Sequence, residues 1–286
     1  MSGKLKEVRE RIKSVASTQQ ITKAMKMVAA ARLRKAQEKA SVNEPYTNKM
    51  KQVLADVAGN AGSVVEHPLL TVRPVQRTVY LVVGPDKGLA GAYASNVFKE
   101  TVAKIEAKES TNIIAIGRKT KDYFGKRGYN VISSYENFSE KPSYDKAREI
   151  SRQLMQLFTD TACDEIYMVY TRFVSAIQVV PTTVKLLPLT NLEENKSLAS
   201  GTEYIYEPSA AEVLGYLLPQ YFETMVYGAL LQAAASELGS RMTAMSSATD
   251  NAEELINKLI LNYNKVRQAS ITSEISEIVS GAEALK

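Results

Sequence analysis

The sequence predicts an α/β fold combined with a long coiled coil: an antiparallel coiled coil of the N- and C-terminal helices that carries an inserted Rossmann-like α/β domain. Three observations lead to this prediction. Residues 209–286 read as one helix almost without a break, and residues 1–58 read as a second long helix. Between them, residues 76–190 alternate short apolar strands with helices. We take these three segments as the N-terminal long helix, the α/β domain and the C-terminal long helix.

The N-terminal helix carries a narrow seam with heptad-like spacing, which turns polar in its middle. The seam consists of Leu5, Val8, Ile12, Val15, Thr18, Thr22 and Met25. We expect Pro45 to kink this helix and Gly59 to end it, so that helical character stops at about Ala58. So narrow an apolar face needs a partner helix, and the other end of the chain supplies one.

The central segment predicts a sheet with a largely parallel part, because its strands alternate with helices. Strands are expected at Thr78–Val83, Asn112–Ile116, Asn130–Ser133, Glu165–Thr171 and Val179–Leu187, the last two joined as a hairpin through Ser175 and Ala176. Helices are expected at Gly91–Lys108, Lys119–Lys126 and Tyr144–Thr161. Residues 57–74 and 191–200 read as connectors.

The loop from Gly84 to Tyr93 follows the first strand, where α/β sheets often bind nucleotides. The motif G-x-x-x-x-G-K-[ST] is absent, because Lys87 precedes Gly88 and does not follow it. The motif G-x-G-x-x-G is absent as well. A tight turn that needs glycine at Gly88 and Gly91 is the better explanation of this loop.

The C-terminal helix opens with a capping box formed by Ser209 and Glu212. At roughly 1.5 Å per residue it approaches ~117 Å, whereas ordinary globular helices run about 8–20 residues. Two heptad-like seams follow, offset from each other: Leu255, Leu259, Asn262, Val266 and Ala269, then Ile271, Ile275, Ile278, Ala282 and Leu285. The helix needs a partner helix, a sleeve of other proteins, or both. An amphipathic helix lying on its own domain is the alternative.

The charge of the chain is concentrated in its first helix. The whole chain of 286 residues has a formal charge of +5, but residues 1–40 hold eleven basic and three acidic residues, a net charge of +8. Such a segment predicts an acidic neighbour, which could be nucleic acid, a membrane surface or a carboxylate-rich protein. Nucleic acid is the weakest of the three, because no recognisable nucleic-acid-binding motif accompanies the charge.

Catalytic chemistry is sparse. The single histidine, His67, has no clustered carboxylates or thiols, and the single cysteine, Cys163, is expected to be buried and neutral. One cysteine excludes a disulfide within the chain and fits a reducing compartment. We therefore expect no catalytic residue, cofactor or metal site. No signal or transit peptide is evident, and no apolar run approaches ~20 residues, so membrane association is expected only through partners.

Three stretches of the sequence resemble the gamma subunit family of the F-type ATP synthases, and the resemblance covers essentially the whole chain. Residues 271–284 match the family's C-terminal signature at every specified position, and residues 263–270 before them are also typical. Residues 11–30 are similar to the family's N-terminal hallmark. Residues 86–93 resemble a third family pattern, with Pro85 in place of its serine and Ala90 in place of its cysteine.

The resemblance implies a central rotor shaft. In this family the terminal helices form a coiled coil inside a ring of three alpha and three beta subunits, and the ring carries the catalysis. The α/β domain and the adjoining helix ends form a foot on the ring of c subunits, beside the epsilon subunit. The resemblance thus implies one copy per complex, which couples ion-driven rotation of the c ring to ATP synthesis or hydrolysis, with no cofactor and no nucleic acid partner. The sequence lacks a transit peptide and the cysteine-bearing insert of chloroplast members, which implies a bacterial cell membrane and its cytoplasmic side. The coupling ion stays open.

The resemblance also implies contacts with the beta subunits. Arg267 and Gln268 match positions that contact a catch loop of beta, and Thr272 and Glu274 lie beside them. An arginine fork suits bidentate recognition of a carboxylate. The alternative for these residues is a solvated helix face.

Two further groups follow from the resemblance. Met25 and Lys26 match the region that faces an acidic lever segment of beta, although Met25 could equally be a plain seam residue. Tyr204, Tyr206 and Glu207 match the family's contact with the c ring, although the tyrosines could instead pack within the foot.

Two other functions remain as alternatives. A stand-alone α/β binding module with a coiled-coil stalk would dimerise through its own helices and ignore an ATPase ring. An ATP-using enzyme would show turnover as a purified chain.

Overall fold

The computed structural model describes residues 2–60, 67–189, 206–207 and 209–284. Two long helices, α1 (Ser2–Asn60) and α5 (Ala210–Ala284), flank the strands and shorter helices in the sequence. The chain groups into two compact units, one of residues 1–28 and 242–286 and the other of residues 29–241. The division of the sequence into segments 1–58, 76–190 and 209–286 stays a prediction.

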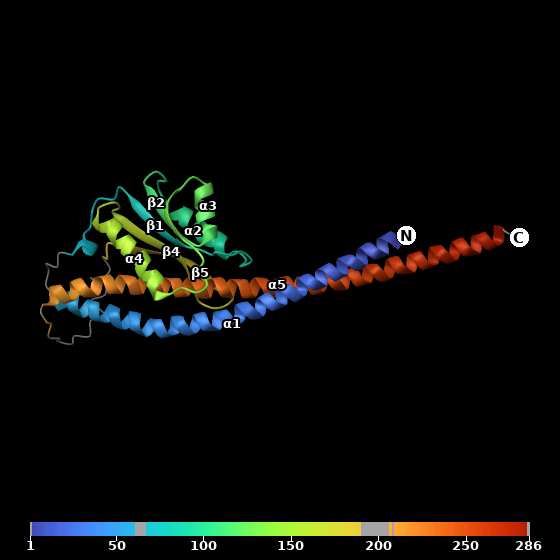
Figure 1. The fold of residues 1–286 in the computed structure, drawn as a ribbon, viewed down its shortest axis with the longest axis horizontal. Coiled ribbons are helices and arrows are strands. Elements are labelled where there is room, and N and C mark those ends of the chain that lie inside the picture. Colours follow the sequence, from blue (N-terminus) through green and yellow to red (C-terminus); the bar gives the residue numbers. More distant parts are fainter. Residues whose placement is uncertain (1, 61–66, 190–205, 208, 285–286) are drawn as a thin grey trace. The chain divides into compact units, whose positions relative to one another are not determined.

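The unit of residues 29–241 is built on a sheet with the strand order β3-β2-β1-β4-β5 (Figure 1). The strands are β1 (Thr78–Val83), β2 (Thr111–Ile116), β3 (Asn130–Tyr135), β4 (Glu165–Phe173) and β5 (Val179–Leu187). The first four are parallel, and β5 is antiparallel to β4. Because Thr78 pairs with both Thr111 and Glu165, β1, β2 and β4 begin at one edge of the sheet and end at the other.

Helices cover both faces of this sheet (Figure 1). Alternate residues of β1 point to opposite faces, so Tyr80 and Val82 pack with α2 (Tyr93–Lys104) and α3 (Arg118–Lys126). Leu81 and Val83 pack in the larger core with α4 (Tyr144–Thr159) and with the parts of α1 and α5 that belong to this unit. The central strands β1 and β2 are buried on both faces, as in doubly wound α/β domains. The predicted fold class, an α/β sheet between two long terminal helices, is confirmed.

The predicted cap of the last helix is also present. The backbone N–H of Glu212 donates to Ser209 Oγ at 3.3 Å, and the N–H of Val213 donates to the Ser209 carbonyl at 3.0 Å. The predicted hairpin between β4 and β5 forms as well, closed by the N–H groups of Val174 and Ser175 on the Gln178 carbonyl.

Several predicted helix ends were wrong. The helix expected to reach Lys108 stops at Lys104, because Ile105 has an extended backbone. The helix expected to reach Thr161 stops at Thr159, since Thr161 has a positive φ of 56°. Helix ends are set by single backbone torsions that composition does not reveal.

One prediction about α1 needs correction in the same way. Gly59 does not end the helix, which continues through Asn60. Pro45 lies inside the helix, and the kink expected there stays a prediction. One of the two expected connectors, residues 57–74, contains the end of α1 and the short 3-10 helix η1 (Pro68–Leu70), whereas residues 191–200 lie outside the described residues.

Two turns meet at the carboxyl ends of β1 and β2. Gly117 follows β2 with a φ of +88°, and a Cβ atom there would overlap the backbone carbonyl groups of Gly84 and Pro85. Both a left-handed torsion and a lack of space therefore require glycine at this position.

We predict that Gly117→Ala lowers the free energy of unfolding by about 2–4 kcal/mol, because the strain and the overlap add. Urea denaturation of the purified chain measures this change. Gly125→Ala is the matched control, since Gly125 lies in α3 with no atom within 4 Å of an added Cβ. It should be neutral or stabilising by up to about 1 kcal/mol. Equal effects of the two substitutions would contradict this account of the turn.

Candidate functional site

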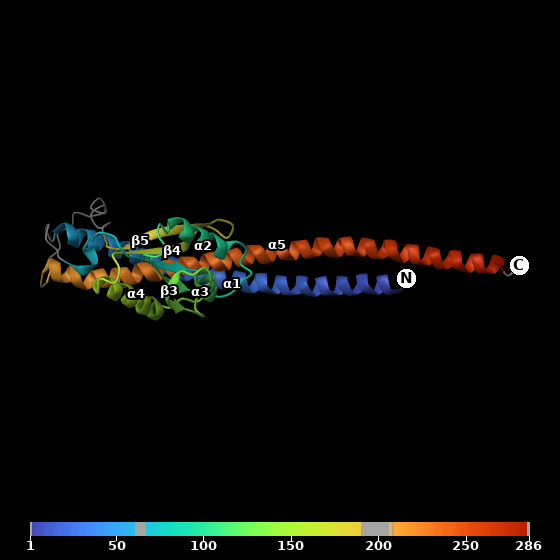
Figure 2. The same cartoon turned by 90° about the horizontal axis from the view of Figure 1, so that it is seen from above.

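The paired ends of the two long helices form the unit in which most of the predicted contact residues lie. Here α1 and α5 lie side by side and run antiparallel (Figures 1 and 2). Thr22 Oγ1 and Thr249 Oγ1 are 2.9 Å apart, and Lys26 Nζ donates to Ser246 Oγ at 2.9 Å. The two contacts fix the register, because four residues forward on α1 correspond to three residues back on α5.

The predicted seam of α1 is confirmed with one exception. Its half-buried members are Leu5, Val8, Ile12, Val15, Gln19, Thr22 and Met25. Thr18 is exposed, and its hydroxyl donates to the Ser14 carbonyl at 3.1 Å. Gln19 takes the predicted place of Thr18, so the polar middle of the seam is made by a glutamine and a threonine.

The seam of α5 was predicted with the wrong phase. Leu259 and Val266 are covered as expected, but Leu255, Asn262 and Ala269 are exposed. The covered positions repeat at steps of three and four residues: Met245, Thr249, Ala252, Ile256, Leu259, Tyr263, Val266 and Ser270. Small and polar residues hold several of these positions opposite the polar middle of α1, so a count of apolar residues selects the wrong stripe.

The described part of the second predicted seam of α5 is exposed in the structure. Ile271, Ile275 and Ile278 are 49%, 56% and 70% exposed, and every residue from Glu274 to Glu283 is exposed. The register explains this exposure. The N-terminal end of α1, at Ser2, lies opposite the stretch of α5 around Ser270. In both views α5 continues past the N-terminus of α1 (Figures 1 and 2). Leu285 lies outside the described residues.

Four of the predicted contact residues share the exposed surface just before and within this uncovered part. Arg267, Gln268, Thr272 and Glu274 are all exposed. Thr272 Oγ1 donates to the Gln268 carbonyl at 3.0 Å, and Glu274 accepts a long hydrogen bond of 3.5 Å from Ser270. Among the described residues, Arg267 forms no ion pair, so its guanidinium is available to a partner.

The other predicted contacts lie elsewhere. Met25 is half-buried in the seam, whereas Lys26 is exposed apart from its bond to Ser246. The register places them about 30 Å along the helix pair from Arg267, given a rise of about 1.5 Å per residue.

The residues before α5 belong to the unit of residues 29–241. Tyr206 is half-buried and packs against the larger core, and Glu207 is exposed. Tyr204 lies outside the described residues. The packing of Tyr206 supports the alternative that this tyrosine packs within the α/β unit. Because Tyr206 is only half-buried, this packing is compatible with a contact through its exposed part.

A buried ionic network was missed in the sequence. Arg241 on α5 is 6% exposed and donates to Glu237 at 2.7 Å and to Glu140 at 3.2 Å. The same guanidinium donates to the Gly88 carbonyl, and Arg32 on α1 also pairs with Glu140. Burial raises the pKa of Glu237, and Arg241 partly offsets this rise. The i, i+4 spacing of Glu237 and Arg241 was the available signal, but only the fold shows that the pair is buried.

The loop after β1 is held by Asp86 and leaves little scope for a phosphate. Asp86 accepts from the backbone N–H of Arg118 at 3.0 Å, at the N-terminus of α3, and from the N–H of Ser139 at 3.1 Å. Burial alone would raise the pKa of Asp86, but hydrogen bonds from backbone N–H groups and from Ser139 outweigh it, so the pKa lies below its usual 3.8. A carboxylate of the chain thus fills the place that a bound anion would take at this helix.

The glycine prediction in this loop was half right. Gly91 has a φ of 57°, as a turn that needs glycine would require. Gly88 has no such torsion, and an added Cβ would meet no atom within 4 Å. Leu89 takes the other left-handed position, with a φ of 62°.

The two residues with possible nucleophilic or acid–base chemistry have structural surroundings. The His67 side chain accepts from the N–H of Leu69 and caps η1. Cys163 is buried as predicted, and burial raises the pKa of its thiol to about 11. The described residues contain no group of three or more metal-ligating side chains. Among them, no helix is long and apolar enough to cross a membrane.

Comparisons with known proteins agree with this arrangement. A family model described as ATP synthase matches residues 4–285. The chain is 47% identical over 287 residues to the ATP synthase gamma chain of Halothermothrix orenii, covering 99% of each chain. It is also 47% identical to that of Brevibacillus brevis over 289 residues, again covering 99% of each.

Solved structures show the same fold. One chain in a structure of the Tetrahymena thermophila mitochondrial ATP synthase central stalk and c ring is 25% identical, with a TM-score of 0.60 over 80% of this chain and 99% of that one. A chain in a structure of the Euglena gracilis mitochondrial ATP synthase has a TM-score of 0.74 over 100% and 95% of the two chains. Its identity of 18% shows the likeness of fold alone.

We predict that Asp86→Asn lowers the free energy of unfolding by about 1–3 kcal/mol near neutral pH, because an amide cannot accept at both positions that the carboxylate serves. The folded-state pKa is depressed, so this stabilisation is present above pH 3.8 and is lost as pH falls through the folded-state pKa. The difference between wild type and variant should therefore stay constant from neutral pH down to about pH 5 and shrink as the pH falls further through 3.8 in urea denaturation. Asp122→Asn, at an exposed carboxylate of α3, is the control. A difference that does not change with pH would refute the assignment.

Proposed function

The chain belongs to the family of ATP synthase gamma chains, and on this premise we propose that it turns as a shaft and contacts the beta subunits through the exposed end of α5. The single observation that carries the proposal is the uncovered apolar stripe of Ile271, Ile275 and Ile278. An exposed stripe of this kind marks a surface that another protein covers. A ring of alpha and beta subunits around the helix would supply that cover.

The charge of the first helix fits the same partner. Residues 1–40 carry a net charge of +8, and most of their lysine and arginine side chains are exposed. An acidic segment of each beta subunit would meet this surface in turn as the shaft rotates. Lys26 lies on it beside Met25, and both are proposed contacts with that acidic segment.

The shaft would act through differential stabilisation. A ring of three beta subunits around one asymmetric helix pair presents three different contacts at any moment. Each orientation favours one set of nucleotide affinities, so rotation changes the affinity of each site in turn. Arg267 and Gln268 would form the polar part of the contact, with Thr272 and Glu274 beside them.

Catalysis is assigned to the beta subunits and not to this chain. His67 caps a short helix and Cys163 is a buried thiol, so both residues have structural surroundings. We assign no cofactor to the chain. The foot is proposed to contact the c ring beside the epsilon subunit, through Tyr204, Tyr206 and Glu207, which precede α5 in the sequence. This places one copy per complex at the cytoplasmic side of a bacterial membrane, peripherally and through its partners.

Reconstitution with purified alpha and beta subunits tests the proposal. The chain alone should show no ATP hydrolysis, should join the ring at one copy per three beta subunits, and should raise hydrolysis by the ring. A chain that dimerises and ignores the ring would favour a stalked binding module, and turnover by the chain alone would favour an enzyme.

We predict that Arg267→Ala lowers ATP hydrolysis by the reconstituted complex about three- to tenfold, because a charge-assisted hydrogen bond contributes roughly 1.5–3 kcal/mol and is made in only some orientations. Steady-state hydrolysis at equal amounts of assembled complex measures the effect. Lys265→Ala is the control, since it removes a neighbouring exposed cation on a different helix face. Equal losses in the two variants would argue against a specific contact at Arg267.

We predict that Ile275→Asp with Ile278→Asp weakens assembly with the ring about tenfold or more, because charge would be buried against an apolar sleeve. The melting temperature of the free chain should not change, since both side chains are already exposed. Ile275→Leu with Ile278→Leu, which keeps apolar volume, should assemble normally. Pull-down with the ring and thermal unfolding are the two measurements, and normal assembly of the aspartate variant would remove the stripe from the interface.

A further inference from the structure

A buried carboxyl group lies where α5 leaves the α/β unit. Glu237 is 1% exposed and lies one turn before Arg241, the last residue of the unit of residues 29–241. Its Oε1 accepts from Arg241 Nη2 at 2.7 Å. Its Oε2 is also buried, and among the described residues it has no hydrogen-bond partner at ordinary geometry. A buried carboxylate oxygen without a donor is costly when the group is ionised.

Arg241 has a charged partner other than Glu237. Glu140, in the loop after β3, accepts from Arg241 Nη1 at 3.2 Å. The Nε and Nη2 atoms of the same guanidinium donate to the Gly88 carbonyl at 3.4 and 3.3 Å. A protonated carboxyl group keeps a carbonyl oxygen that accepts hydrogen bonds. Arg241 therefore stays paired whether or not Glu237 carries a charge.

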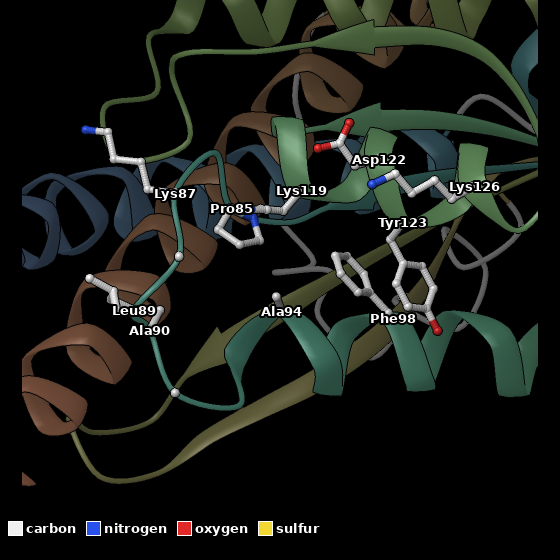
Figure 3. A pocket seen from close by; sticks show the side chains of 12 residues that line it. Pro85, Lys87, Leu89, Ala90, Ala94, Phe98, Lys119, Asp122, Tyr123 and Lys126 are labelled. Atoms are coloured by element: carbon white, nitrogen blue, oxygen red, sulfur yellow. The ribbon is translucent and has the colours of Figure 1, made fainter. Parts of the chain in front are cut away.

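The surroundings of Glu140 are positive. Arg32 of α1 pairs with the same carboxylate, and Lys87 lies 3.7 Å from it. Figure 3 shows Lys87 on the loop after β1, which lies beside α5. Three cations around one carboxylate favour the ionised form of Glu140. This leaves Glu237 as the acid of the cluster that can take up a proton.

The groups that face Glu237 from the other elements are neutral or negative. Tyr93, at the start of α2, is buried, and burial together with the Glu237 carboxyl raises the pKa of its phenol well above 10, so that it stays neutral. The Ser139 hydroxyl comes from the loop after β3. Asp86, which accepts from the N–H of Ser139, is a further carboxylate beside this loop. None of these groups compensates a negative charge on Glu237 as Arg241 does.

Burial is the largest influence on the acidity of Glu237. It raises the pKa of this carboxyl, Arg241 and the Ser139 hydroxyl lower it, and the charge of Glu140 raises it again. The balance is a pKa above the usual 4.5. The folded chain thus binds this proton more tightly than the unfolded chain does.

We propose that Glu237 is a buried proton-binding site, and that the loss of its proton as the pH rises weakens the attachment of α5 to the α/β unit where the helix leaves that unit. The protonated form keeps the hydrogen bond to Arg241 and carries no charge on the unpartnered oxygen. The ionised form places that charge in the interior without a donor. This inference goes beyond the proposed rotor function and does not rest on it.

Urea denaturation of the purified full chain and of Glu237→Gln, from about pH 5 to about pH 9, tests the proposal. The folded-state pKa is raised, so the stabilisation is present in full below 4.5 and is lost as the pH rises through the folded-state pKa. Relative to the variant, the unfolding constant of wild type should rise about tenfold per pH unit above 4.5 and become constant above the folded-state pKa. An ordinary ion pair predicts instead a wild type that is more stable than the variant at neutral pH, with no such rise.

Hydrogen exchange followed by mass spectrometry locates the effect in the chain. After correction for the intrinsic exchange rate, the backbone amides of residues 233–241 should lose protection as the pH rises, by up to about tenfold per pH unit. The same amides of Glu237→Gln should keep a constant protection over this range, because glutamine does not ionise.

Two further variants separate the site from the rest of the chain. Glu140→Gln leaves Glu237 as the carboxylate partner of Arg241, so the pH at which the unfolding constant becomes constant should fall by about one unit or more. Glu253→Gln, at an exposed carboxylate of α5, is the matched control and should keep the pH dependence of wild type.

The proposal is overturned if the unfolding constant of wild type, relative to Glu237→Gln, does not rise with pH. It is also overturned if Glu237→Gln does not fold at neutral pH, since glutamine resembles the protonated acid. An unchanged transition in Glu140→Gln, or a loss of the pH dependence in Glu253→Gln, would place the proton elsewhere. None of these results depends on assembly with a ring, so failure here and failure of the rotor proposal are distinguishable.

Discussion

The structure depends on how the apolar and small side chains of α5 are kept from water along its 75 residues. Between Leu214 and Arg241 the helix is buried in the α/β unit, where the larger core surrounds it. From Met245 to Ser270 one stripe is covered by α1. Beyond Ser270, Ile271, Ile275 and Ile278 are exposed among the described residues. Burial of apolar surface stabilises by about 25 cal/mol per Å², so this last part gains its stability only with a partner.

The way α5 is held changes along its length. In the α/β unit the Arg241 guanidinium connects Glu237, Glu140 and the Gly88 carbonyl, and Tyr93 donates to the Ala233 carbonyl at 3.3 Å. Breaking a buried ion pair of this kind costs about 3–5 kcal/mol, because a charge is left without a partner. The helix pair of the other unit uses a thin seam with a threonine pair at Thr22 and Thr249, whose hydrogen bond contributes about 0.5–1.5 kcal/mol.

The pattern of apolar residues was enough to predict the sheet, its parallel part and the two long helices, because the central strands β1 and β2 are nearly continuous apolar runs and the seam of α1 is mostly aliphatic. It was not enough for the phase of the α5 seam. Ala252, Thr249 and Ser270 are covered, while Leu255 is exposed, because a seam is defined by what faces it and not by its own hydrophobicity. To predict the register of the helix pair, the seams of both helices must be matched to each other. The polar residues in the middle of the α1 seam, and the small and polar residues opposite them on α5, weakened the apolar periodicity of both helices.

Single contacts were also beyond the sequence. The loop after β1 reads as a glycine turn, yet Leu89 holds one left-handed position and Gly88 serves by presenting its carbonyl to Arg241. Asp86 reads as a surface charge, but its buried carboxylate ties the loop to α3 and to Ser139. In both cases partners distant in sequence decide the role of a residue, and only tertiary structure brings them together.

These differences have a consequence for a shaft. A helix that is locked by buried charges within the α/β unit cannot turn about its own axis there without breaking the pairs of Arg241. A torque on that unit would therefore pass into the backbone of α5, whose helical turns continue from Arg241 to Ala284. The seam of the helix pair is mostly aliphatic, with a polar middle at Gln19, Thr22 and Thr249, so the two helices share least apolar surface in that middle. Torque carried along α5 would therefore meet its weakest apolar contact with α1 at that point.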